Sequence, residues 1–409
     1  MNVVGIVAEY NPFHNGHKYH LIESLKNTKA THSIVVMSGN FLQRGEPAIL
    51  DKWTRAQMAI DEGVDLVIEL PFAYACNSAE YFAFGAVSLL NNMNIVDYVS
   101  FGSELGNIDD LTKISKVLNE EPSEYTDDLK KFLKEGISYP AAREKALFKY
   151  FNHGNLSHII GSPNNILGIE YIKSLLKLGS PIKPSTVKRY KAHYHSKELY
   201  GNISSATAIR KVLFHNPLDK TLESVMPSES YKILQESLIK YNKPVFYNDF
   251  SQMIIQTLRK SSPEYLKSLV DVGEGLENRL KSSATKAIHI DSLLDNIKTK
   301  RYALTRIQRI LIHSLMGYTK DTLNHFRDTG PLYARVLGFS PKGTELLKVM
   351  KERSLVPILT NINRQSVDSK ALSMLSLDIL ATDLYTLSIT NENLRHGGYD
   401  YYNKPYIKR

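Results

Sequence analysis

The sequence contains only one cysteine, Cys76, and no long uninterrupted apolar run. A single thiol cannot form an intramolecular disulfide or supply a cysteine-based zinc cage, so both kinds of structural crosslink are excluded. A membrane helix needs roughly 18 consecutive apolar residues, and no window of the sequence approaches that length. The first residues also lack the charged region and cleavage site of a secretory signal. We therefore expect a cytoplasmic protein that is not held at a membrane, and nothing in the sequence implies an obligate protein partner.

Acidic residues are too few to balance the basic ones, and the imbalance lies in one half of the chain. Residues 1–215 contain 23 Lys and Arg against 22 Asp and Glu, whereas residues 216–409 contain 28 against 20, so the second half has most of the net charge of +9. A basic excess confined to one part of a chain is typical of proteins that bind a polyanion, usually a nucleic acid. An ordinary basic surface remains the alternative.

The length of 409 residues and the order of apolar segments predict two domains. Runs of strand length alternate with amphipathic helical spacing over the first hundred residues, which is typical of a parallel sheet covered by helices on both faces. After residue 216 the periodicity is almost entirely helical. The sequence thus predicts an α/β, Rossmann-like domain over 1–215 and a basic α-helical domain over 216–409. The segments expected in the first domain are strands at 3–10, 33–38, 64–70, 96–101 and 182–190, with helices at 14–29, 51–63, 79–94 and 205–213.

Two histidines follow the first predicted strand, in the segment His14-Asn15-Gly16-His17. The N-terminus of a helix presents unpaired N–H groups and positive dipole character, which suit phosphate. Gly16 lets the backbone approach a ligand closely. Imidazoles three residues apart share one face of the first turn, where both can donate hydrogen bonds to phosphate oxygens. Donors of this kind stabilise charge that grows during an in-line displacement.

Two other interpretations of these histidines stay open at the level of sequence. A zinc site would need a third protein ligand, for which His20 is the nearest histidine, and no established zinc motif is present. The two histidines could also be structural residues with internal hydrogen bonds.

The histidine segment resembles the His-x-Gly-His motif of the nucleotidyltransferase superfamily. Residues 203–210 (ISSATAIR) resemble the superfamily's second phosphate motif, a Ser/Thr-capped helix start with Arg210 one turn inside. Longer segments are similar to one family within it, the bacterial tRNA(Met) cytidine acetate ligases. These segments are 5–17, 37–47, 65–71, 101–104 and 163–168, the segment that ends in Arg189, and, more loosely, 299–302 and 337–339.

This resemblance implies a fold, a reaction and a set of site residues. The fold is a nucleotidyltransferase core with a helical, tRNA-binding C-terminal domain. In the reaction, acetate attacks the α-phosphate of ATP to give acetyl-adenylate, and the wobble cytidine of elongator tRNA(Met) then takes the acetyl group on its exocyclic amine. Mg²⁺ is expected with ATP, held mainly by phosphates and water, with no metal site made of protein side chains.

The residues that the resemblance assigns to this reaction lie in both halves of the chain. His14 and His17 are the expected catalytic residues. Gly102 would permit close approach of adenosine, Asn164 would contact base or ribose, and Arg189 would lie near the phosphates. The full set expected to bind ATP is Val7, Ala8, Glu9, Tyr10, Asn11, Pro12, Phe13, His14, Asn15, Gly16, His17, Lys18, Tyr19, His20, Gly102, Asn164 and Arg189.

Three expectations rest on weaker patterns. Arg44 follows the second strand and could reach acetate, phosphate or tRNA, or form an ion pair with Glu46. The basic segment 279–309 favours contact with RNA as a group, and Tyr302, which lies among its cations, could stack on a base. The alternative is a solvated basic face with Tyr302 half-buried in the helical core, which is the more common outcome for any single residue. The cations expected to bind tRNA are Lys298, Lys300, Arg301 and Arg306.

Two other functions compete with the ligase. An adenylyltransferase acting on a small phosphorylated acceptor, such as phosphopantetheine or nicotinate mononucleotide, would explain the histidines but not the basic half. An RNA-binding protein with a relict nucleotide site would be expected to have lost phosphate-binding residues, yet His14, Gly16, His17 and Arg210 are all present.

Overall fold

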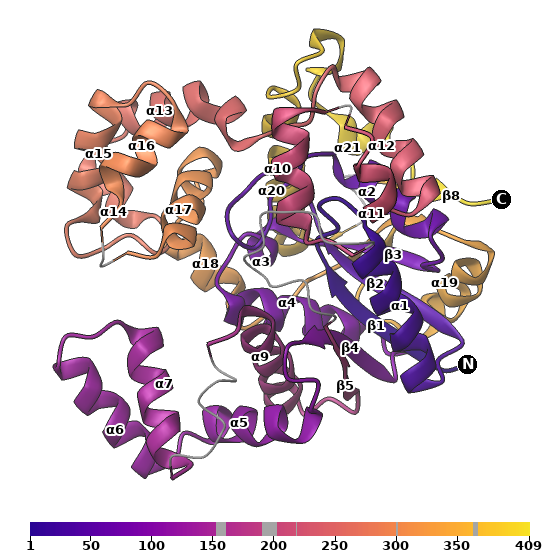
Figure 1. Ribbon diagram of the computed structural model, residues 1–409, viewed down its shortest axis with the longest axis horizontal. Helices are drawn as coiled ribbons and strands as arrows, with labels where there is room; N and C mark the ends of the chain where they lie inside the picture. The colour runs from indigo at the N-terminus through magenta and orange to yellow at the C-terminus, as the bar shows by residue number, and fades with distance from the viewer. Residues whose placement is uncertain (153–160, 190–202, 218, 300–301, 363–366) are drawn as a thin grey trace.

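A computed structural model describes residues 1–152, 161–189, 203–217, 219–299, 302–362 and 367–409. One sheet runs through the molecule in the order β5-β4-β1-β2-β3-β6-β7, with β8 paired to β6 (Figure 1). Five of the strands are parallel: β1 (Val3–Ala8), β2 (His32–Ser38), β3 (Leu66–Leu70), β4 (Tyr98–Ser103) and β5 (Lys183–Lys188). The remaining strands are β6 (Ala334–Phe339), antiparallel to β3, with the two-residue strands β7 (Ile358–Leu359) and β8 (Tyr406–Ile407) parallel to β6.

The apolar runs of the sequence form the buried centre of this sheet. Every residue of β2 and β3 is buried, as continuous apolar strands require when helices cover both faces. Connections between parallel strands are right-handed, so α1 and α2, which lead from β1 to β2 and β3, cover one face. The chain then returns past β1 to form β4 and β5, and the helices of those connections cover the other face. The helices of this part are α1 (Asn15–Thr28), α2 (Lys52–Asp61), α3 (Phe72–Ala75), α4 (Ala79–Asn92), α5 (Ile108–Glu120), α6 (Ser123–Lys134), α7 (Tyr139–Tyr150), α9 (Pro163–Leu178) and α10 (Ala206–His215).

This strand order places β1 beside β4 at the point where the direction of winding reverses. In open α/β sheets, ligands bind in the crevice outside the carboxyl ends of the strands at such a switch point. The predicted histidine segment follows β1, and Gly102 lies near the end of β4. The strand order therefore places the predicted site residues at the edge of the sheet where this fold class binds ligands.

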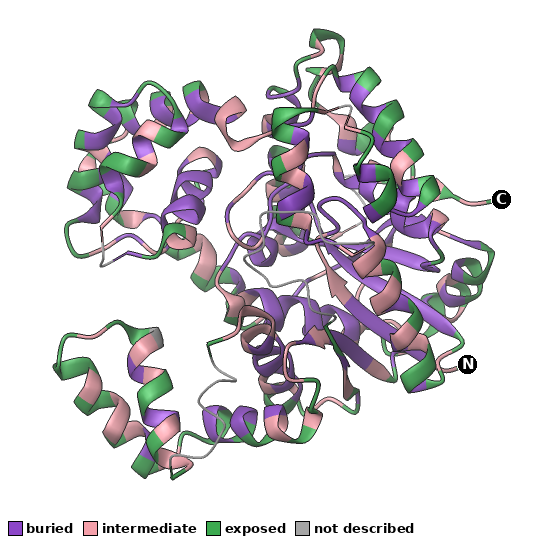
Figure 2. Cartoon of the chain, in the orientation of Figure 1, coloured by how far each residue is buried: buried purple, intermediate pink, exposed green. Residues whose placement is uncertain are grey.

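Helices dominate the second half of the chain, and Figure 1 shows α13 to α16 grouped away from the sheet, with α17 and α18 next to them. Figure 2 shows alternating buried and exposed residues on these helices, whereas α6 and α7 are mostly exposed or intermediate. The helices of this half are α11 (Leu222–Val225), α12 (Ser228–Tyr241), α13 (Ser251–Lys260), α14 (Pro263–Ser268), α15 (Leu276–Lys286), α16 (Ile290–Ile297), α17 (Leu304–Met316), α18 (Lys320–Phe326), α19 (Pro341–Arg353), α20 (Ser369–Thr386) and α21 (Tyr399–Tyr402), with single 3-10 turns at Tyr247–Phe250 and Glu392–Leu394.

The second half of the chain is mostly helical, as expected, but three strands that the sequence analysis did not predict, β6, β7 and β8, extend the sheet of the first half. β7 and β8 have two residues each, which is too short to give a periodic signal, and β6 is a single six-residue run within a region of helical periodicity. Their pairing is set by tertiary contacts. The division into domains at residue 215 stays a prediction.

A cluster of buried charges joins the end of the chain to this sheet. Lys52 on α2 donates to Glu69 on β3 at 2.8 and 2.9 Å and to Asp400 on α21 at 2.7 Å. Arg335 on β6 forms ion pairs with the same two carboxylates, at 3.1 Å to Glu69. Buried charges are tolerated when they are paired in this way. Residues 335 and 400 are therefore part of the structure that supports the carboxyl edge of β3.

No helix in the described parts of the chain is both long and apolar enough to span a membrane.

Candidate active site

A cavity of about 260 Å³ lies at the carboxyl ends of β1, β4 and β5, beside the N-termini of α1 and α10. The wall of this cavity brings together the two segments that the sequence predicts to bind phosphate, the histidine segment and residues 203–210. His17 and Arg210 are 193 residues apart in the sequence. The cavity is lined by Ile6, Val7, Ala8, Glu9, Tyr10, His14, Gly16, His17, Tyr19, His20, Leu42, Gln43, Arg44, Glu46, Phe82, Phe101, Gly102, Asn164, Leu167, Tyr171, Val187, Lys188, Arg189, Ile203, Ser204, Ser205, Ala206, Thr207 and Arg210.

His14 and His17 are held by the first turn of α1. His14 is the N-cap residue, and its Nδ1 accepts a hydrogen bond from the N–H of Gly16 at 3.0 Å. The Nδ1 of His17 accepts from the N–H of His14 at 3.3 Å, which completes a capping box. A backbone N–H can only donate, so both Nδ1 atoms are acceptors. In the neutral imidazole the proton then resides on Nε2, and each histidine keeps one N–H donor for a ligand.

Burial and nearby cations keep both rings neutral. The pKa of His14 is lowered to about 3 by burial and by the positive charges of Arg189 and Arg210. The pKa of His17 is also well below its usual value, first because of burial and then because of His14 and Arg189. His20 lines the same cavity, and burial lowers its pKa to about 4. Neutral donors fixed beside a helix N-terminus suit the oxygens of a phosphate.

The second predicted phosphate segment begins α10. Ser205 is the N-cap residue, and its hydroxyl accepts from the N–H of Ala208 at 3.1 Å. Arg210 donates to the carbonyl oxygen of Asn11 at 3.1 Å and forms an ion pair with Glu46 at 3.4 Å. These contacts join α10 to the loop after β1 and to the loop after β2. The guanidinium is thus held at the wall of the cavity, 22% exposed, where it can bind a second phosphate group.

The end of β4 and the start of α9 form the opposite wall. A Cβ atom at Gly102 would lie 3.2 Å from Cγ of Arg189, so glycine keeps this wall thin and leaves room for the arginine stem. Glu104 receives hydrogen bonds from the Asn164 side chain at 2.6 Å and the Asn165 N–H at 3.0 Å. The Asn165 side chain in turn accepts from the N–H groups of Glu104 and Leu105. The side chains of Asn164 and Asn165 thus tie the start of α9 to the loop after β4, and Asn164 also lines the cavity.

Most of the residues predicted to bind ATP line this cavity, but five do not. Phe13 is fully buried in the core, and the Asn11 side chain accepts from the N–H of Ile49 at 2.9 Å. Asn15 donates to the carbonyl oxygen of Ser224, and Lys18 forms an ion pair with Glu62. Pro12, the fifth, is buried between these residues. The side chains of these five residues hold the loop after β1 in place and do not line the cavity. Contact between their backbone and ATP stays a prediction.

Several cavity residues escaped the sequence analysis. Phe82 comes from α4, while Leu167 and Tyr171 come from α9. In the sequence they are ordinary apolar positions of amphipathic helices, with no signal that separates a cavity wall from a core. Gln43 and Glu46 lie in the loop that was singled out for Arg44. Arg44 does line the cavity, while Glu46 binds Arg210.

The geometry does not favour the zinc interpretation of the histidines. Nδ1 of His14 and Nδ1 of His17 are both occupied by backbone donors. In the described part of the chain no group of three or more His, Cys, Asp or Glu side chains is placed to hold a metal ion.

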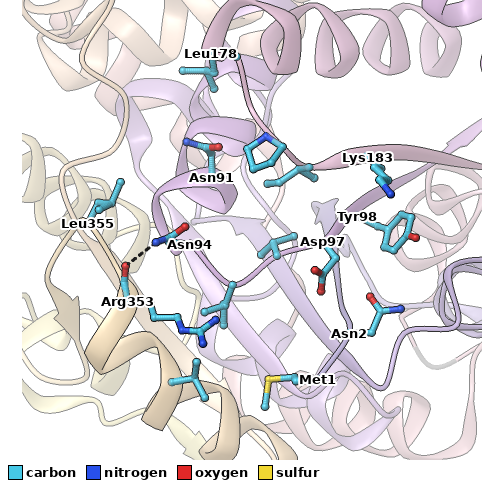
Figure 3. Close-up of a pocket in the computed structure, with 16 residues that line it drawn as sticks. Met1, Asn2, Asn91, Asn94, Asp97, Tyr98, Leu178, Lys183, Arg353 and Leu355 are labelled. Carbon is cyan, nitrogen blue, oxygen red and sulfur yellow. Dashed lines mark hydrogen bonds between the residues drawn. The ribbon is translucent and has the colours of Figure 1, made fainter.

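A larger cleft, of about 860 Å³, lies at the opposite edge of the sheet (Figure 3). It is lined by residues at the starts of β1, β4 and β5, including Asn2, Asp97 and Lys183. Its polar groups largely bind one another or nearby backbone: Asp97 accepts from the N–H of Val3, and Asn94 donates to the carbonyl oxygen of Arg353. The amino edge of a parallel sheet is not where ligands bind, so the smaller cavity is the candidate active site.

Of the basic residues expected to bind tRNA, the structure describes Lys298 and Arg306, and only Lys298 is free to contact RNA. Lys298 is exposed, directly after α16. Arg306 donates to the carbonyl oxygen of Asp271 at 3.1 and 2.7 Å, so it braces α17 within the protein. Tyr302 is only 8% exposed, which agrees with the buried alternative and not with stacking on a base. The segment 298–303 joins α16 to α17 and is not itself a helix where described. Lys300 and Arg301 lie outside the described residues.

Comparison with known proteins assigns the family. The family model for HIGH nucleotidyl transferases matches residues 1–400. The chain is 44% identical to the tRNA(Met) cytidine acetate ligase of Alkaliphilus metalliredigens over all of this chain and 99% of that protein. It is 47% identical to the ligase of the same name from Thermoanaerobacter sp. strain X514 over the whole of both chains. The chain belongs to the tRNA(Met) cytidine acetate ligase family of HIGH nucleotidyltransferases.

Solved structures agree with this assignment and confirm the expected fold class. The apo crystal structure of Thermotoga maritima TmcAL superimposes with a TM-score of 0.95, at 36% identity, over the whole of both chains. The structure of the same protein bound with alpha-thio ATP gives a TM-score of 0.93 over all of this chain and 99% of that one. The resemblance seen in the sequence motifs is thus confirmed over the full length of the chain.

Proposed function

We propose that this protein is an ATP-dependent ligase that activates acetate as acetyl-adenylate and transfers the acetyl group to the wobble cytidine of elongator tRNA(Met). The observation that carries the proposal is the neutral pair His14 and His17, which line one cavity together with Arg210. The relatives' name, tRNA(Met) cytidine acetate ligase, and the nucleotide analogue in the Thermotoga structure supply the substrates.

The geometry supports a division of labour in the first step. Nε2–H groups of His14 and His17 would donate to oxygens of the α-phosphate and the leaving pyrophosphate. Arg210 and the N–H groups at the start of α10 would bind the β- and γ-phosphates. Charge moves onto the pyrophosphate as the P–O bond breaks, so these fixed donors stabilise the transition state more than bound ATP. Gly102, Asn164 and Arg189 form the wall proposed to hold adenosine.

Mg²⁺ belongs to this proposal as the ion that accompanies ATP and reduces the charge on its phosphates. It prefers phosphate oxygens and water to a complete cage of protein ligands. The donor set around the cavity agrees with that preference, because His14, His17 and Arg210 are hydrogen-bond donors and not ligands for a hard cation.

Exchange of labelled pyrophosphate into ATP tests the first step. With acetate and Mg²⁺ present we expect exchange that depends on acetate and falls by about 10²-fold or more in the His17→Ala protein. Exchange that ignores acetate, but requires a phosphopantetheine- or nicotinate mononucleotide-type acceptor, would support the adenylyltransferase alternative instead.

A further inference from the structure

Among the described residues, two carboxylates line the candidate active-site cavity, and they differ in their partners. Glu46 is engaged on both oxygens, with Arg210 at 3.4 Å and with the side chain of Gln308 at 3.5 Å. Glu9 has no ion-pair partner among the residues that the structure describes. Glu46 would have to give up its ion pair with Arg210 before it could bind a ligand, whereas Glu9 would not. The two carboxylates can therefore have different functions.

Glu9 is rigidly placed at the end of β1. Its carbonyl oxygen accepts from Arg55 at 2.5 Å, and Arg55 is fully buried and also bound to the carbonyl oxygens of Leu50 and Ser38. Oε1 of the Glu9 side chain accepts from the N–H of Gln43 at 2.9 Å. Oε2 accepts no hydrogen bond from the described part of the chain, and the residue lines the cavity with His14 and His17.

Glu9 is half-buried between apolar side chains and one buried cation, Arg55, on whose pKa the negative charge of Glu9 acts. Tyr171 lies near Glu9. Burial is the main cause that raises the pKa of the Tyr171 phenol, and the negative charge of Glu9 raises it further. Phe82 and Leu42 line the same cavity and are 2% exposed. A half-buried carboxylate oxygen is a stronger hydrogen-bond acceptor than one at the surface, because less water competes for it.

The second step of the proposed reaction needs an acceptor of this kind. The lone pair of the exocyclic amine of cytidine is delocalised into the ring, so the amine becomes a nucleophile only as a proton leaves it. Carboxylates are the side chains that accept hydrogen bonds from this amine in nucleic-acid recognition. A base placed to take the proton typically contributes 10²–10⁴-fold to a rate.

We propose that Glu9 is a catalytic residue of acetyl transfer, orienting the exocyclic amine of cytidine through Oε2 and accepting its proton. The N–C bond to the acetyl carbon forms, the bond from that carbon to the adenylate oxygen breaks, and AMP leaves with the bonding electron pair. The amine proton passes to Glu9 and then to water. This assignment rests on the proposed function.

Glu9→Gln removes the acceptor at Oε2 and keeps the hydrogen bond that Oε1 accepts from the N–H of Gln43. The N–H of Gln43 requires an acceptor, so the amide oxygen takes the place of Oε1 and the amide NH₂ replaces Oε2, where it can only donate. The loop is retained and the base is lost. Glu9→Asp keeps a base at a shorter reach. Glu23→Gln is the matched control, because Glu23 lies on α1 outside the cavity lining and forms a surface ion pair with Lys26.

The two steps are measured separately on the full-length proteins. Acetyl-adenylate formation is followed by acetate-dependent pyrophosphate exchange, and transfer is followed in a single turnover from preformed, enzyme-bound acetyl-adenylate to tRNA. We expect Glu9→Gln to lower transfer by about 10²-fold or more and exchange by only a few-fold, Glu9→Asp to recover part of the transfer rate, and Glu23→Gln to match the wild type.

Two results would contradict the assignment, and they differ. If Glu9→Gln lowers exchange as much as transfer, Glu9 serves ATP or its Mg²⁺ and not the amine. If Glu9→Gln transfers acetyl at the wild-type rate, no base is needed at this position. Wild-type protein that makes no acetylated tRNA at all overturns the proposed function first, and the assignment with it.

Discussion

The imidazole of His14 stacks on the imidazole of His17, with ring centroids 3.8 Å apart and planes inclined at 29°. Two protonated rings at that separation would repel each other strongly, which is one reason the pKa of His17 is lowered. The capping box fixes both rings by their Nδ1 atoms, so the pair is a rigid, neutral set of two Nε2–H donors. Its chemistry follows from the local conformation of the first turn of α1.

Neutral buried histidines predict a loss of stability at acidic pH. The pKa of His14 falls from 6.5 in the unfolded chain to about 3 in the folded protein, so between those values only the unfolded state binds the proton. Stability therefore falls as pH falls below 6.5, and His14 alone contributes about 2 kcal/mol to the loss between pH 8 and pH 5. His14→Asn keeps an N-cap acceptor and removes the titrating ring.

Denaturant unfolding at pH 8 and pH 5 measures this effect. We expect the free energy of unfolding to drop less in His14→Asn than in the wild type, by about 2 kcal/mol. An equal drop in both proteins would show that His14 is protonated as readily in the folded state as in the unfolded one.

The loop after β2 packs closely against α17 at Gly45, so a larger side chain at this position should destabilise the protein. Its φ is +78°, and an added Cβ would lie 2.3 Å from the backbone nitrogen of Arg309. Gly45→Ala therefore meets both backbone strain and a collision with a helix backbone, and we expect a loss above about 1–3 kcal/mol. Because the loop also positions Gln43 and Glu46, KM for ATP should rise.

Gly179→Ala is the control for that experiment. Gly179 also has positive φ, +56°, but nothing lies within 4 Å of an added Cβ. It should show the strain cost alone, so thermal unfolding of the two variants separates strain from collision. If both variants lose the same stability, the loop does not depend on contact with α17.

The buried charge cluster predicts that the end of the chain is needed for stability. Asp400→Asn leaves Lys52 and Arg335 without one of their two carboxylates in the interior, where breaking a buried pair costs about 3–5 kcal/mol. Asp328→Asn removes a carboxylate that is 72% exposed and pairs with Lys177, so its effect should be near zero. Chemical denaturation compares them, and equal midpoints would mean that the cluster contributes nothing.

The cations of residues 298–301 predict salt-dependent binding of tRNA. Replacing Lys298, Lys300 and Arg301 with alanine should weaken binding and reduce the slope of log K against log salt by about two to three. Arg306 is left unchanged because it braces α17. Filter binding at several salt concentrations tests this, and an unchanged affinity and slope would exclude this segment as a tRNA contact.

The sequence alone predicts the parallel part of the fold well, for a physical reason. β1 to β4 are continuous apolar runs separated by amphipathic helices, and that alternation has one common solution. β6 to β8 give no such signal, because they do not alternate regularly with helices, and the two-residue strands β7 and β8 form only through the partner they pair with. The pairing of β6 with β3 is a long-range contact that no local pattern contains.

The site divides in the same way. The histidine segment and the Ser205 cap are local motifs, visible because each builds a helix N-terminus. The helix-borne walls of the cavity are not, since Phe82 and Tyr171 look like any buried aromatic residue until α4 and α9 are placed. The sequence left the placement of Tyr302 open for the converse reason: the cations beside it indicate a surface, but its ring packs inward.

The most direct test of the central claim is transfer of labelled acetate to RNA. Protein, ATP, Mg²⁺ and labelled acetate are incubated with and without bulk bacterial tRNA, and acid-stable label on RNA is counted. The account predicts label on tRNA that requires ATP and is lost in His14→Ala and His17→Ala proteins whose circular dichroism matches the wild type. Folded wild-type protein that places no label on tRNA, while transferring adenylate to a small phosphorylated acceptor, would contradict it.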